Sequence, residues 1–183
     1  MKRLFVLLPI LLVLCGCSIQ KMAFNATADM LAPPAASLPT DGNNPMIALT
    51  GENDPELVAA FFPTALKLYE ILHLQNPGHE NLAIMTGQLY IMYANAFVQG
   101  PAEQLPFDEF TRQNTEYARA QNFFMRGRTF VLKALDARYP RFSETVFSSD
   151  REARAALLAS CKKSDTDALF WAASGLFGAF SLS

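Results

Sequence analysis

The sequence has 183 residues, of which 51% are hydrophobic and 17% are charged, and its formal net charge is −2. This mildly acidic balance provides no basic surface for nucleic acid, so the composition excludes a nucleic-acid-binding protein. The chain holds three cysteines and two histidines. These are too few and too scattered to indicate an enzyme built on a nucleophile or a metal.

The first 16 residues are typical of a secretory signal. Two basic residues precede an uncharged run, Leu4–Leu14, which is shorter than the roughly 20 apolar residues needed to cross a bilayer. The next residues, Leu14–Cys17, resemble the bacterial lipobox, in which a leucine stands three positions before an invariant cysteine. We therefore expect residues 1–16 to be removed and Cys17 to carry lipid. An ordinary cleaved signal with chance cysteines is the alternative.

Lipidation of Cys17 has two consequences for the mature chain. The 13 basic and 17 acidic residues that remain give a formal charge of −4. Only Cys161 is then free, so no intramolecular disulfide can form. Stable attachment to a membrane needs more than one acyl chain, and the lipid of bacterial lipoproteins supplies several. Cys161 is expected to be a half-buried residue of a helix.

Residues 17–49 are predicted to be a lipidated, flexible tether. The stretches Ala32–Thr40 and Asp41–Pro45 are rich in proline and turn-forming residues. Such a segment would hold a folded body away from the membrane surface. The folded domain is expected to occupy residues 50–183.

The first helix of this domain is expected to begin after Asp54, whose side chain can cap it, with Pro55 at the first helical position. Apolar residues then recur at steps of three and four until the chain reaches Asn76-Pro77-Gly78. Pro63 lies inside this pattern and is expected to kink the helix, because proline removes a backbone hydrogen bond.

A second helix is expected from about His79 to Gln99. Its central part, Leu82–Val98, carries no charge and is apolar on nearly every face. Such a helix must be covered by protein, by an oligomer partner or by a ligand. The polar residues within it disfavour a membrane span. Gly100-Pro101 is expected to interrupt the chain after it, and so is Leu105-Pro106.

Three further helices complete the expected fold, which is all-α because the mature chain contains no convincing strand pattern. A long helix is predicted over Thr111–Tyr139, closing at Pro140. A shorter one is predicted over Ser149–Lys162, with Ser149 or Asp150 as its cap. The last begins after Asp165 and runs through Phe180.

The spacing of particular residues predicts antiparallel helix pairs of the tetratricopeptide type, which stack into an α-solenoid. Trp171–Phe180 is strongly apolar, whereas the end of such a stack needs a polar cap, so an oligomer neighbour or further chain is expected to cover it. The residues that match the repeat fall into three groups: Ala65, Tyr69 and Pro77; Gly87 and Tyr90; and Trp171 and Gly175.

Asp54–Val58, Ala65–Lys67 and above all Tyr90–Gln99, with its Tyr-Ala-x-Ala-Phe-Val run, resemble the T component associated with tripartite ATP-independent periplasmic (TRAP) transporters. The resemblance covers about Gly51 to Ser183. It implies a lipoprotein that faces the periplasm, forms trimers around an apolar pore and associates with the transporter's substrate-binding protein. The implied function is a scaffold that docks this protein and holds or passes an apolar organic ligand.

Two alternatives stay open at this point. Members of the family are substantially longer, with more helix pairs after the helix that contains Trp171, so the resemblance implies a chain shortened at its C-terminus. A truncated, inactive remnant is one alternative. A general interaction lipoprotein with tetratricopeptide-like repeats is the other, since fold does not fix function.

Four residues of the second helix are candidates for a ligand pore or an oligomer interface: Tyr90, Tyr93, Asn95 and Phe97. Packing in the core is the competing explanation for each. Asn95 is the most informative, because its amide could bind a ligand or cross an interface. No cofactor, metal or catalytic site is predicted: His79-Glu80 lacks the second histidine of a zinc-protease helix, and Asp165 and Asp167 are interpreted as first-turn acids of the last helix.

Overall fold

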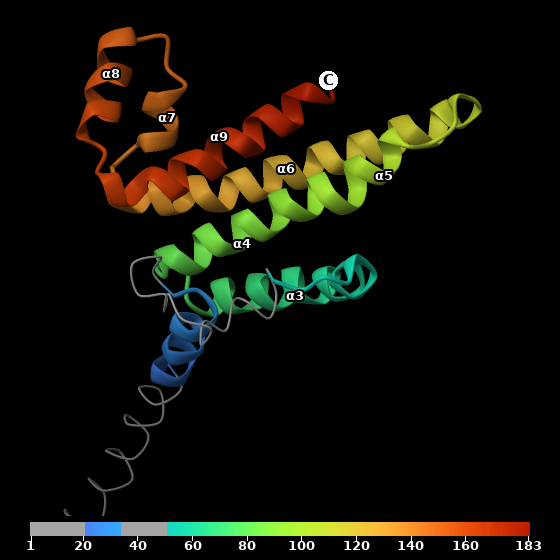
Figure 1. The fold of residues 1–183 in the computed structure, drawn as a ribbon. Helices are drawn as coiled ribbons and strands as arrows, with labels where there is room; N and C mark the ends of the chain where they lie inside the picture. The colour runs from blue at the N-terminus through green and yellow to red at the C-terminus, as the bar shows by residue number, and fades with distance from the viewer. Residues whose placement is uncertain (1–20, 34–50) are drawn as a thin grey trace, which may run out of the picture.

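The computed structural model describes residues 21–33 and 51–183, which are helical with connecting turns and contain no strand (Figure 1). The predicted all-α class is confirmed. Residues 1–16, Cys17 and residues 34–50 lie outside the described part of the chain. Four long helices form the body: α3 (Pro55–Gln75), α4 (Glu80–Tyr93), α6 (Phe110–Arg138) and α9 (Thr166–Ser181).

The long helices are packed in chain order, and consecutive ones run in opposite directions (Figure 1). α4 lies between α3 and α6, and α6 lies between α4 and α9. The outermost layers are therefore α3 on one side and α9 on the other. The shorter elements are the π-helix η2 (Ala94–Gln99), α5 (Gly100–Glu103), α7 (Phe142–Val146), α8 (Arg151–Ser160) and two 3-10 turns, η3 (Phe107–Glu109) and η4 (Lys163–Asp165).

The helix starts follow the predicted capping chemistry. The Asp54 carboxylate accepts hydrogen bonds from the backbone N–H groups of Glu56 and Leu57, at 2.9 and 3.1 Å, directly before α3. Asp150, one of the two expected caps, accepts from the Ala153 N–H at 2.9 Å and starts α8. The helix α3 is continuous from Pro55 to Gln75 and includes the exposed Pro63.

The expectation that Gly100-Pro101 interrupts the second helix is wrong. The chain stays helical through Gly100–Glu103 and leaves the helix only near Gln104. A proline in a regular α-helix would clash with the carbonyl one turn earlier. Here the preceding turn is widened into a π-helix, in which the Gly100 N–H reaches back to the Asn95 carbonyl. The wider turn accommodates Pro101 without a break.

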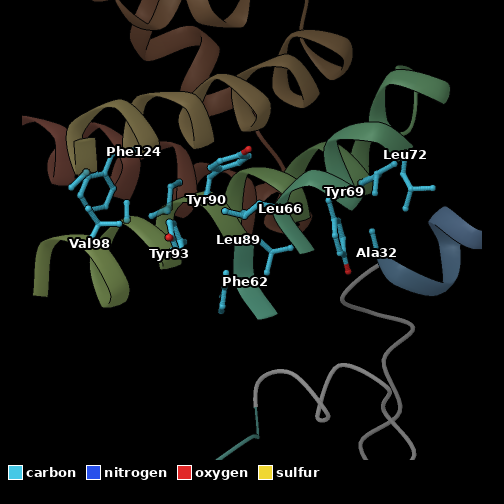
Figure 2. Close-up of a cluster of buried hydrophobic side chains, with 14 of the residues drawn as sticks. Ala32, Phe62, Leu66, Tyr69, Leu72, Leu89, Tyr90, Tyr93, Val98 and Phe124 are labelled. Carbon is cyan, nitrogen blue, oxygen red and sulfur yellow. The ribbon is translucent and has the colours of Figure 1, made fainter. Parts of the chain in front are cut away.

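The apolar cover that α4 requires comes from the same chain. α3, α6 and α9 all pack against it, and Leu82, Leu89 and Tyr90 are fully buried. Figure 2 shows the resulting core, in which side chains of α3 meet those of α4 and α6. A second hydrophobic cluster joins the start of α4, the C-terminal part of α6, α7 and the start of α9. Burial of α4 therefore needs no ligand or second subunit.

Glycines bring α4, α6 and α9 into backbone contact. A Cβ on Gly87 of α4 would lie 2.5 Å from the Gly127 carbonyl oxygen of α6, and a Cβ on Gly127 would lie 2.6 Å from the Gly87 oxygen. A Cβ on Gly175 would lie 3.0 Å from the Phe124 oxygen, and one on Gly178 would overlap the Phe124 ring. Gly175 and Gly178 thus let the last helix pack closely on α6.

Residues 21–31 form a helix that docks against the turn between α3 and α4, within the segment expected to be a flexible tether. Its small residues Ala28 and Ala32 are buried in the main core, because alanine allows a helix to approach closely. Three polar contacts hold it: Tyr69 Oη donates to the Leu31 carbonyl at 2.7 Å, Asn76 Nδ2 donates to Asn25 Oδ1 at 2.6 Å, and His79 Nε2 lies 3.0 Å from Asp29 Oδ1.

Asp165 has a larger role than a first-turn acid. Its carboxylate accepts from Arg138 at 2.7 Å, from the Tyr139 hydroxyl at 2.5 Å and from the Lys162 N–H at 2.8 Å. Burial opposes its ionisation, but these three donors outweigh burial and hold the pKa of Asp165 below its ordinary value. Arg138 also bonds Glu80 of α4. The network ties together the start of α4, the end of α6 and the start of α9.

Candidate functional site

The four predicted site residues lie on one continuous stretch, with Tyr90 and Tyr93 on α4 and Asn95 and Phe97 on η2. Tyr90 is 1% exposed and Tyr93 is 9% exposed, whereas Phe97 is half-buried and Asn95 is exposed. The structure thus brings the three aromatic residues together and leaves the Asn95 amide on the surface beside them.

The three rings belong to a larger group, called here the aromatic cluster. Its members come from α3, α4, η2 and α6, and neighbouring ring centroids are 5.4 to 6.1 Å apart, the range of stacked and tilted aromatic pairs. His73 of α3 meets the Phe130 ring edge-on, with 5.2 Å between the two ring centroids. The aromatic cluster consists of Phe62, Tyr90, Tyr93, Phe97, Phe123 and Phe130.

The widened turn η2 carries Phe97, one of the three half-buried rings of the aromatic cluster together with Phe123 and Phe130. It turns Ala94 and Val98 into the core and leaves Asn95 and Ala96 exposed. Single π-helical turns inside α-helices occur frequently at functional sites. The backbone feature coincides with the Tyr-Ala-x-Ala-Phe-Val run, so the most distinctive part of the sequence is also the most distinctive part of the helix geometry.

Three cations of α6 cover one edge of the aromatic cluster at steps of seven residues. Arg119 lies 5.3 Å from the Phe123 ring centroid, Arg126 lies 5.0 Å from that of Tyr90, and Lys133 lies 5.3 Å from that of Phe130. These separations are those of cation–π contacts. The edge of the cluster is therefore positively charged on the α6 side.

Two acidic residues balance part of this charge. Arg119 pairs with Glu116 at 3.0 Å and donates to the Tyr93 hydroxyl at 3.2 Å. Arg126 pairs with Glu70 of α3, which also lies close to Tyr90. Burial and the proximity of Glu70 raise the pKa of Tyr90. Its phenol therefore stays neutral at physiological pH.

One acceptor beside the site has no hydrogen-bond partner in the part of the chain that the structure describes. Gln99, the last residue of η2, donates from Nε2 to Glu103 at 2.7 Å, while its buried Oε1 makes no hydrogen bond. Buried polar atoms are normally satisfied, so an unpaired one calls for an explanation such as a water or a ligand. In the described parts of the chain, no group of three or more His, Cys, Asp or Glu side chains could hold a metal ion.

Sequence reasoning missed the partners that α3 and α6 contribute. Phe123 and Phe130 are seven residues apart, in step with Arg119, Arg126 and Lys133, and this periodicity could have placed them on one face of α6. Phe62 shares the helical phase of the buried Leu66 and Tyr69. Their convergence on Tyr90 and Tyr93, however, depends on how three helices pack.

The arrangement is that of an all-α protein with a buried aromatic group between layers of helices. A family model described as TRAP transporter T-component matches residues 51–183, which is most of the chain. The chain therefore belongs to the TRAP transporter T-component family.

A relative from Treponema pallidum (strain Nichols), described as an uncharacterized protein, is 43% identical over 175 residues. The alignment covers 93% of this chain and 54% of the relative. The chain thus spans about half the length of that relative.

Proposed function

We propose that the mature chain is a periplasm-facing lipoprotein scaffold of a TRAP transporter, which docks the substrate-binding protein and holds or passes an apolar organic ligand. The aromatic cluster carries this proposal. Its rings extend from the interior to the half-buried Phe97, beside the exposed Asn95. Aromatic faces offer an apolar ligand a large contact area, and a neighbouring amide can bind its polar end.

Membrane attachment in this proposal comes from lipid on Cys17 after removal of residues 1–16, with residues 17–49 as the connection and residues 50–183 as the working domain. The helix at 21–31 gives that connection a fixed point on the domain. Replacement of Cys17 by Ser should release the protein from membranes, as read by fractionation. Trimer formation, implied by the family resemblance, belongs to the same proposal.

The tip formed by α5, η3 and the start of α6 is our choice for docking the substrate-binding protein. Phe107 is 95% exposed there and Phe110 is also exposed. Exposed aromatic side chains are enriched among the residues that dominate protein interfaces. Tetratricopeptide-like packing would present this tip at one end of the helix pairs.

The first test is light scattering after size exclusion on residues 18–183, with and without the TRAP substrate-binding protein of the same organism. A defined oligomer that shifts to a larger complex supports the scaffold. A well-folded species that does not bind the substrate-binding protein favours a general interaction lipoprotein, and aggregated material favours an inactive remnant.

Phe107→Ala should weaken complex formation by about tenfold or more, equivalent to roughly 1.4 kcal/mol. Leu158→Ala, an exposed apolar change on α8, is the control.

Ligand binding is tested separately with the fluorescent apolar probe N-phenyl-1-naphthylamine. Asn95→Ala and Phe97→Ala should each reduce probe affinity or oligomer assembly, because both residues border the surface end of the aromatic cluster. Asn122→Ala removes an exposed amide from α6 and is the matched control. Unchanged probe affinity and unchanged assembly in both site variants would count against this site.

A further inference from the structure

The outer face of α3 is apolar along its whole length and meets no other described part of the chain. α3 packs one face on α4, burying Phe62, Leu66 and Tyr69. The opposite face carries an apolar stripe at steps of three, four and seven residues, which places its members on one side of a helix. The outer stripe consists of Leu57, Phe61, Leu68, Ile71 and Leu74, each between 45% and 76% exposed.

Few charges interrupt the outer stripe. Glu56 stands in the first turn, Glu70 is turned toward Arg126 and is largely covered, and Lys67 is the exposed charge in the middle of the helix. The Lys67 ammonium pairs with Glu70 at 2.9 Å, and its side chain is 62% exposed. A lysine beside an apolar face can keep its charge at the level of the lipid headgroups while its carbon chain stays on the apolar surface. The charge pattern is thus compatible with a membrane surface.

Among the helices in the described residues, α3 is long and apolar enough to cross a membrane. Crossing would strip α3 from α4 and expose the core side chains of Phe62, Leu66 and Tyr69. Lying flat keeps that packing and places only the outer stripe in lipid, as an interfacial helix does.

The position of α3 matches the proposed anchor. The helix at 21–31 attaches at the C-terminal end of α3, on the side of the stack opposite to α9 (Figure 1). Residue 21 is four positions after Cys17, and four residues span at most roughly 14 Å. Met22 and Met30 of this helix are exposed as well. A lipid on Cys17 would therefore lie on the α3 side of the molecule.

We propose that the outer stripe of α3 lies on the lipid bilayer, at the boundary between headgroups and acyl chains. This inference rests on the proposed lipid anchor. The protein is then held on the membrane at two places, by the lipid on Cys17 and by α3. The two contacts fix the orientation of the stack, so that α4, α6 and α9 form successive layers away from the surface.

Depth measurements on the lipidated chain in vesicles of phosphatidylethanolamine and phosphatidylglycerol test the orientation. In a Cys161→Ser background, Leu68→Cys or Ile71→Cys is labelled with the fluorophore NBD, and Leu176→Cys or Phe177→Cys on α9 is the matched control. We expect a blue-shifted emission and quenching by brominated lipid at the α3 positions only. Equal, water-like emission at α3 and α9 in protein that floats with the vesicles overturns the proposal while leaving the anchor intact.

Three other outcomes are decisive. If the α3 labels are shielded from water without vesicles in a monomer, residues 34–50 cover the outer stripe, and the proposal is overturned. If they are shielded in the same way in an oligomer, a second copy of the chain covers the outer stripe, and the proposal is again overturned. A mature protein whose mass shows no lipid on Cys17, and which does not float, removes the anchor and the α3 contact together.

A second measurement adds charge to the outer stripe. In the lipidated protein labelled with NBD at Phe61→Cys, the double change Leu68→Glu and Ile71→Glu should reduce quenching by brominated lipid at least tenfold, because two carboxylates disfavour contact with acyl chains. Leu176→Glu with Phe177→Glu on α9 should leave this quenching unchanged. Circular dichroism checks that both proteins fold. Equal quenching in the two folded variants contradicts a membrane contact through α3.

Discussion

The two sides of the helix stack are joined by different means. α4, α6 and α9 touch through glycines, with the Gly87 and Gly127 backbones in direct contact. α3 is joined to α4 through large side chains such as Phe62, and the helix at 21–31 is joined to α3 by a hydrogen bond from the Tyr69 hydroxyl. Backbone contact leaves no room to adjust, whereas a layer of side chains can repack. The glycine side is therefore the rigid part, and α3 is the adjustable one.

Both outer helices nevertheless expose apolar side chains. α9 exposes Phe170, Phe177 and Phe180, as α3 exposes its outer stripe. The difference is the position of the helix at 21–31, which lies next to α3 and away from α9 (Figure 1). Exposed apolar surface alone thus does not identify a partner, and its place relative to this helix separates the two faces.

The largest expected effect is at the contact of α4 with α6. In Gly87→Val the new side chain would begin 2.5 Å from the Gly127 oxygen, so the two helices must separate. We expect the free energy of unfolding to fall by roughly 3–4 kcal/mol in a urea titration. Gly78→Ala, where nothing lies within 4 Å of the added carbon, should change it by less than about 0.5 kcal/mol. Equal unfolding midpoints would refute the backbone contact.

The next effect concerns the Asp165 network on the same side. Asp165→Asn removes a 2% exposed carboxylate that faces Arg138, and should cost about 2 kcal/mol, compared with about 0.5 kcal/mol for the exposed Asp167→Asn. Because the pKa of Asp165 is lowered on folding, its contribution is present above the unfolded-state pKa of about 3.9 and is lost as the pH falls through the lower folded value. Acid titrations of the two variants by circular dichroism would show a difference that disappears at low pH.

On the adjustable side, Tyr69→Phe removes the hydrogen bond to the Leu31 carbonyl. Burial raises the pKa of the Tyr69 hydroxyl to about 12, so it remains a donor at neutral pH. We expect a loss of about 1 kcal/mol, confined to the docking of residues 21–31 and visible as faster hydrogen exchange there. Tyr117→Phe is the control, since Tyr117 is half-buried on α6. Exchange at 21–31 that does not change would show that the contacts of Asn76 with Asn25 and of His79 with Asp29, together with the buried alanines, are enough to hold the helix.

The smallest effect is expected at His73. Burial first, then the charges of Lys133 and His79, lower the pKa of this histidine in the folded chain. The unfolded chain binds the proton more readily, near pH 6.5, so stability should fall gently as the pH drops from 7 toward 5. His73→Leu should flatten this slope in urea titrations at several pH values. A variant with the same slope as the parent would place the titrating group elsewhere.

Local chemistry determined the helix starts and most helix bounds. Asp54 and Asp150 cap their helices because a carboxylate can satisfy free N–H groups from any well-placed position just before a helix. The apolar helix from Leu82 correctly required cover on all sides, and the residues from 51 onward carried enough pattern to indicate the family. These inferences use side-chain types and short spacings, which the sequence contains directly.

Tertiary structure decided what those helices touch. The docking of residues 21–31, the contact of Phe62 with Tyr93 and the contacts of Phe123 and Phe130 with Tyr90 all depend on residues distant in the chain. Asp165 illustrates the point, because its partners Arg138 and Tyr139 are 27 and 26 residues away. Sequence spacing shows which residues share one face of a helix. Only the packing of the helices decides which face of another helix those residues contact. The core, the aromatic cluster and the outer stripe of α3 were therefore defined by the fold.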